Sequence, residues 1–185
     1  MGFFSKNKLT IDQLAEDLAN EVLESISEAS LQQYTTMLRV RDVGESEEFD
    51  DRQKRELLIL KMLAITRAVQ NVFTNSDDEK SLLDKLYAKV YNKISGSKED
   101  QISFEQFINE RYQTYYKILA SKEDNMPFQF GKQFVNYFFN KDIMSSDSRG
   151  EYLPFIMFIA KIFTINLKND SDFFKEILSK YELKK

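Results

Sequence analysis

The segment from Arg55 to Phe73, RELLILKMLAITRAVQNVF, is apolar on two opposite sides when it is read as a helix. The broader side carries these apolar residues at helical spacing: Leu57, Leu58, Met62, Ile65, Ala68, Val69, Val72 and Phe73. Ile59, Leu60 and Leu63 fall on the other side, among polar residues. Such a helix belongs in the interior, because both sides must be covered. We therefore predict an all-α fold in which the other helices pack around this segment.

Signals for helix starts recur along the chain, whereas the residues that mark strand turns are scarce, with 5 Gly and 2 Pro in 185 residues. Three capping boxes are predicted: Thr10 with Gln13, Ser76 with Glu79, and Ser103 with Gln106. Further start signals are Asp50 or Asp51 before the central helix, Pro127, and Ser171 before a final helix that ends by fraying at ELKK. The pattern predicts about seven helices.

The length of the chain favours a single compact domain. We predict a short N-terminal tail at 1–8 and one helical domain at 9–185. The segment 152–167 forms a second very apolar helix, which would bury itself most simply against 55–73. The alternative is a boundary between two subdomains at 96–101, where Gly96 follows a predicted helix.

The residue types that are missing exclude several kinds of chemistry. The chain has no Cys and no His, so disulfides, the usual zinc sites and catalysis by His or Cys are excluded. We therefore lean against an enzyme and expect no cofactor and no metal. The net charge of −4 argues against nucleic acid as a partner. No signal peptide is evident, and the longest nonpolar run, Tyr152 to Ala160, is too short to span a membrane, so we expect a cytoplasmic protein.

Two polar features have competing interpretations. The first predicted helix, Ile11 to Ala29, has an acidic side that includes Asp12 and Glu16, which we interpret as solvated, with a docking surface as the alternative. The stretch SGSKEDQISFEQF, 95–107, resembles the end of a calcium-binding EF-hand loop. Asp100 occupies the position of the turn glycine and Gln106 that of the bidentate Glu, so we predict helix capping rather than a calcium site.

The chain is rich in aromatic residues, with 16 Phe and 9 Tyr. Phe134 and Phe138 follow at helical spacing, and residues of this kind form cores or line apolar ligand pockets. Lys61, Arg67 and Lys161 interrupt otherwise apolar helices. These five residues are the candidate ligand-binding set, in which a cation would bind the head group of the ligand. The competing interpretation is that the cations reach solvent or pair with acids.

The sequence therefore favours a non-enzymatic interaction or scaffold module whose partner is another protein or a second copy of the chain. Outward-facing tyrosines and polar helix faces suit such a surface. The alternative is a helical pocket for an apolar or amphipathic small molecule, with Lys61 or Arg67 binding its head group.

Overall fold

The computed structural model describes residues 7–39, 48–94, 97–121, 123–143 and 149–184. Within these residues the chain forms seven helices and two short strands. In chain order they are β1 (Asn7–Thr10), α1 (Ile11–Glu24), α2 (Glu28–Arg39), α3 (Asp51–Val72), α4 (Ser76–Ile94), α5 (Lys98–Ala120), α6 (Met126–Phe139), α7 (Arg149–Lys180) and β2 (Tyr181–Lys184). The predicted all-α class and the number of helices are confirmed.

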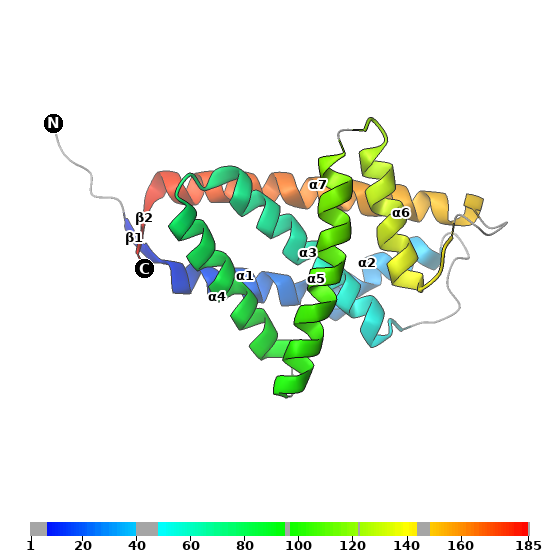
Figure 1. Cartoon of the computed structure of the whole chain (residues 1–185), viewed down its shortest axis with the longest axis horizontal. Coiled ribbons are helices and arrows are strands. Elements are labelled where there is room, and N and C mark those ends of the chain that lie inside the picture. Colours follow the sequence, from blue (N-terminus) through cyan, green and yellow to red (C-terminus); the bar gives the residue numbers. More distant parts are fainter. Residues whose placement is uncertain (1–6, 40–47, 95–96, 122, 144–148, 185) are drawn as a thin grey trace.

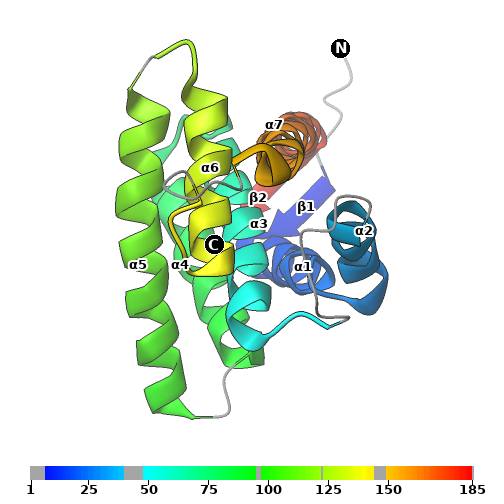
Figure 2. The same cartoon turned by 90° about the vertical axis from the view of Figure 1, so that its right-hand side faces the viewer.

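Helix α3 lies at the centre of the fold (Figures 1 and 2), where it contacts α1, α4, α5, α6 and α7. Every residue from Glu56 to Thr66 is buried, which is more than three turns without an exposed side. This confirms the prediction that the central helix is covered on two sides. Its most extensive neighbour is α7, as expected for the second very apolar segment.

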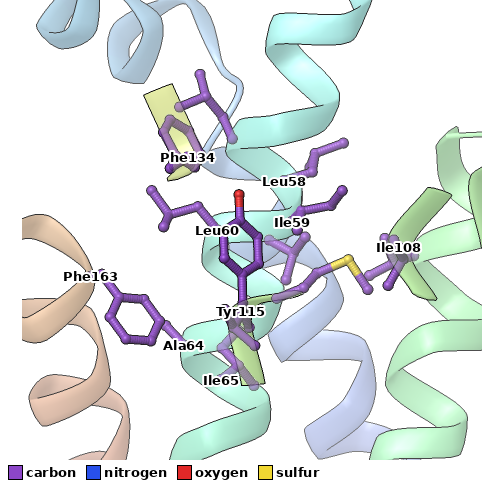
Figure 3. Close-up of a cluster of buried hydrophobic side chains, with 14 of the residues drawn as sticks. Leu58, Ile59, Leu60, Ala64, Ile65, Ile108, Tyr115, Phe134 and Phe163 are labelled. Atoms are coloured by element: carbon purple, nitrogen blue, oxygen red, sulfur yellow. The ribbon is translucent and has the colours of Figure 1, made fainter. Parts of the chain in front are cut away.

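The core around α3 is largely aromatic. Figure 3 shows Tyr115 of α5 beside Leu60, Ala64 and Ile65 of α3. At the α6–α7 contact, a Cβ added to Gly131 would lie 2.3 Å from the backbone oxygen of Ile156. Only glycine permits this approach, so the sequence at residue 131 sets how closely α6 packs on α7.

Helix α7 is continuous through the point where the sequence predicts a new start. The predicted final helix at Ser171 is wrong as a separate element, because the Ser171 hydroxyl donates to the carbonyl of Leu167, 2.7 Å away, inside one helix. A serine hydroxyl can bond a carbonyl one turn back as well as cap a helix start, and here it does the former.

The two ends of the described chain pair with each other. Strands β1 and β2 are parallel, with Leu9 opposite Leu183. The prediction that the C-terminal ELKK frays is therefore wrong, since Glu182 to Lys184 belong to a strand. Within the predicted tail 1–8, residues 1–6 lie outside the described part, and Asn7 and Lys8 begin β1. The single domain at 9–185 stays a prediction.

The predicted helix starts are correct at three places, including Pro127 in the first turn of α6, and shifted at two others. Capping boxes form at Thr10 with Gln13 and at Asp50 with Gln53. Helix α5 begins five residues before Ser103, because Ser97 accepts from the backbone of Asp100 at 3.2 Å. Helix α4 is capped by Asn75, whose side chain accepts from the backbone of Asp77 at 3.0 Å, rather than by Ser76. Since α5 starts at Lys98, most of the EF-hand-like stretch is helical and cannot form a calcium loop.

Candidate functional site

Lys61 lies at the junction of three helices and its charge is matched by two carboxylates. Its Nζ is 2.6 Å from Oε1 of Glu21 on α1 and 3.0 Å from Oδ1 of Asp170 on α7. Lys61 and Asp170 are both buried, at 8% and 6% exposure. Burial raises the pKa of the Asp170 carboxyl, while Lys61 opposes that rise. The cluster ties α1 and α7 to the central helix.

The other predicted site residues lie in different surroundings. Arg67 donates to Oε1 of Gln70 at 3.2 Å, and its guanidinium lies 5.5 Å from the ring centre of Tyr116 on α5. Lys161 is exposed on α7. Phe134 and Phe138 are fully buried and stack on each other, with ring centres 5.8 Å apart.

Within the described part of the chain, these five residues therefore lie in separate surroundings. Lys61 lines a groove of about 300 Å³ with Glu21, Glu24 and Ile165, so acids surround this cation. A head-group clamp needs a cation whose charge is free to meet an anion. The alternative of a pocket for an amphipathic small molecule stays a prediction.

The structure contains a second buried charge cluster, which the sequence does not predict. Glu56 is completely buried on α3 and accepts from Nε of Arg111 on α5 at 2.8 Å. Arg111 lies between two rings, 4.2 Å from the centre of Phe107 and 3.7 Å from that of Tyr137. Burial raises the pKa of Glu56 to about 7, and the bond to Arg111 opposes this rise.

Three buried polar atoms in this region have no hydrogen-bond partner in the part of the chain that the structure describes: Arg52 Nη1, Glu56 Oε2 and Tyr115 Oη. One feature of the sequence indicates that Glu56 is buried. On the helical wheel Glu56 lies one turn from Ile59 and Leu60, on a side of the helix that must be covered. The identity of its partner could not be read, because Arg111 is distant in sequence.

Part of the acidic side of α1 is paired with lysines of α4. Nζ of Lys89 lies 3.3 Å from Asp12 and 3.0 Å from Glu16, and Nζ of Lys93 lies 2.6 Å from Glu16. The two lysines lower the pKa of Glu16 through hydrogen bonds and charge. The interpretation of these acids as simply solvated is therefore incomplete, and these two acids are already engaged within the chain.

The outward side of α7 carries large apolar side chains, in contrast to the acidic side of α1. Among the described residues, four of the five exposed large hydrophobic side chains lie on this helix: Leu153, Met157, Ile165 and Phe173. Leu153, Met157 and Ile165 are 46%, 54% and 45% exposed. Together with Lys161 they follow at steps of four, which places them along one ridge of the helix. We call Leu153, Met157, Lys161 and Ile165 the outer stripe.

Helix α7 also stands out by its length. In the described part of the chain, Gly150–Lys180 is the one helical segment long and apolar enough to cross a membrane by length and composition, and 33% of its most apolar 18-residue window is buried in the fold. The core helix of a soluble protein can pass the same test, but such a helix is mostly buried. This one leaves much of its apolar surface uncovered.

Comparisons with known proteins add no relatives. No protein-family model matches the chain, and neither curated proteins nor solved structures match it. The outer stripe and the buried charge clusters are therefore interpreted from their chemistry.

Proposed function

We propose that this protein is a helical interaction module that associates with a second copy of itself through the outer stripe of α7. The observation that carries the proposal is the run of exposed apolar side chains Leu153, Met157 and Ile165 on one ridge. Single exposed hydrophobic residues are ordinary on protein surfaces, whereas a contiguous apolar patch marks an interaction site. Full burial of one such side chain is favourable by roughly 1.5–3 kcal/mol, so covering the half-exposed stripe supplies a driving force for association.

The order of residues in the stripe suits a second copy. Its four positions are equally spaced about residue 159, so a two-fold axis there sets Leu153 opposite Ile165 of the second copy and Met157 opposite its Lys161. The aliphatic stem of Lys161 can cover Met157 while its ammonium group reaches water.

A protein partner is favoured over a lipid bilayer by what the inner side of α7 holds. Phe155, Ile159 and Phe163 are buried in the core, and Asp170 is tied to Lys61. A membrane crossing would pull these residues from the fold and place Lys161 and Asp170 in hydrocarbon, at a cost of several kcal/mol. Flotation with phosphatidylcholine vesicles checks this directly. Co-flotation of the folded protein would replace the self-association proposal with membrane binding.

The absence of Cys from the chain permits a sharp test. A single cysteine at Met157→Cys lies next to the proposed axis, so a short bis-maleimide cross-linker should give a covalent dimer in high yield. The control is Gln113→Cys, an exposed position on α5 far from the stripe in sequence, which should stay monomeric. Equal cross-linking of the two variants would show random collision and contradict the proposal.

A further inference from the structure

Helices α4 and α5 enclose a groove of about 400 Å³ that is separate from the outer stripe. The two helices diverge in a V in Figure 1. Three tyrosines line the groove, Tyr87 and Tyr91 from α4 and Tyr112 from α5, together with the carboxylates of Asp84 and Glu105. The volume falls within the range of roughly 300–1,000 Å³ that is typical of small-molecule sites.

The three tyrosines of the groove are held in place by contacts with each other and with surrounding residues. The hydroxyls of Thr66, Tyr87 and Tyr112 form a hydrogen-bonded chain, with 2.7 Å from Thr66 Oγ1 to Tyr87 Oη and 3.1 Å from Tyr87 Oη to Tyr112 Oη. Tyr91 stacks on Tyr87 at 6.1 Å between ring centres and packs edge-on against the buried Phe104 at 5.9 Å. Rings fixed in this way lose little freedom when a ligand binds.

The charge of the groove is negative. In the stretches of chain that the structure covers, no Lys or Arg lies within ion-pair distance of Asp84 or Glu105, and the nearby Lys85 is directed to Asp12 on α1 at 3.9 Å. Burial raises the pKa of Tyr87 to about 12, so its hydroxyl is neutral at physiological pH. The fixed charges facing the groove are thus the two carboxylates.

We propose that this groove binds the alkylammonium group of a small organic cation. Aromatic rings attract a cation through their quadrupole, and the two carboxylates that line the groove add Coulomb attraction. An anion would be repelled by Asp84 and Glu105, and a neutral apolar molecule would leave both carboxylates without compensation. An alkylammonium group matches both the rings and the charge.

The test uses choline and its uncharged isostere 3,3-dimethyl-1-butanol, followed by proton NMR. We expect saturable broadening and an upfield shift of the choline N-methyl signal, because those protons would lie near tyrosine rings. The isostere should bind at least tenfold more weakly, since it lacks the charge. Equal binding of the two probes, or no saturable effect of choline, would overturn the proposal.

Variants separate the rings from the carboxylates. The double variant Asp84→Asn with Glu105→Gln should weaken choline binding at least tenfold. Glu123→Gln, which removes an acid from an exposed loop, should leave choline binding unchanged. Tyr91→Phe keeps the ring and should retain binding, while Tyr91→Leu should weaken it severalfold. The carboxylate variants replace exposed side chains, so they test the groove without disturbing the core. If Glu123→Gln weakens choline binding as much as the double variant does, the effect comes from net charge and choline does not bind in this groove.

Discussion

The two very apolar helices, α3 and α7, have opposite surroundings. Helix α3 is enclosed by five other helices, and its buried stretch from Glu56 to Thr66 leaves no apolar side for a partner. Helix α7 packs mainly on α3 and α6, with Tyr34 of α2 against its Phe158, and its outer stripe faces solvent. Similar apolar content thus has two different environments. In α3 it forms the core, whereas in α7 part of it, including the outer stripe, is exposed.

A matched pair of isoleucines tests this contrast most strongly. Ile59 of α3 is completely buried, whereas Ile165 of α7 is 45% exposed. Ile59→Ala should lower the free energy of unfolding by about 2–5 kcal/mol, because it removes buried methylenes and leaves a cavity. Ile165→Ala should cost less than about 1 kcal/mol. Urea denaturation followed by circular dichroism measures both, and equal losses would mean that the two helices are covered alike.

The pH dependence of stability tests the buried charge of α3. The pKa of Glu56 is about 7 in the folded protein, against 4.5 for an ordinary Glu. The folded state therefore holds a proton that the unfolded state releases, and the stability from this site is full below about pH 4.5 and lost as pH rises through about 7.

Glu56→Gln removes this titration while keeping an acceptor for Arg111. Relative to the variant, the wild type should lose about 2–3 kcal/mol between about pH 5 and pH 8. Urea denaturation across this range gives the difference. Parallel pH profiles of the two proteins would show that Glu56 is ionised throughout and that Arg111 fully offsets its burial.

The inner side of α7 should be intolerant of added volume. Gly131→Ala places a Cβ 2.3 Å from the backbone oxygen of Ile156, so α6 and α7 must move apart. We expect a loss of about 1–3 kcal/mol from overpacking, although alanine favours the helix itself. Thermal denaturation measures it, with Gly150→Ala as the control, because a Cβ there meets nothing within 4 Å. Unchanged stability of Gly131→Ala would contradict the close α6–α7 contact.

The link between α3 and α7 through Lys61 should have the smallest effect of this series. Asp170→Asn removes one of the two carboxylates on Lys61 and leaves Glu21, so we expect a loss of about 1–2 kcal/mol. Asp172→Asn, at an exposed pair with Lys175, should change stability by less than about 0.5 kcal/mol. Equal losses of stability in the two variants would show that the buried pair does not hold these helices together.

What the sequence predicts well is local. The two-sided apolarity of 55–73 is visible within a few turns and correctly places α3 at the centre. The capping boxes at Thr10 and Asp50 likewise depend on residues three apart. Ser171 and Ser103 are predicted as helix starts but lie inside helices, because the sequence pattern around a serine within a helix resembles that at a helix start.

What the sequence does not predict depends on distant partners. The pairing of β1 with β2, the bond of Glu56 to Arg111 and the position of Asp170 beside Lys61 all join residues far apart in the chain. The helical wheel places Lys61 in an apolar face, but it cannot identify the carboxylates that pair with this lysine. It also treated the apolar residues of 152–167 as core, since periodicity cannot tell a covered apolar side from an exposed one.

Sedimentation velocity over a wide range of protein concentrations tests the central claim most directly. The wild type should shift from monomer to dimer as concentration rises. Met157→Glu, which sets a charge in the outer stripe at a position already 54% exposed, should remain monomeric with an unchanged Tm. A wild type that stays monomeric throughout, or a Met157→Glu variant that dimerises equally well, would contradict the role of α7 as an interaction surface.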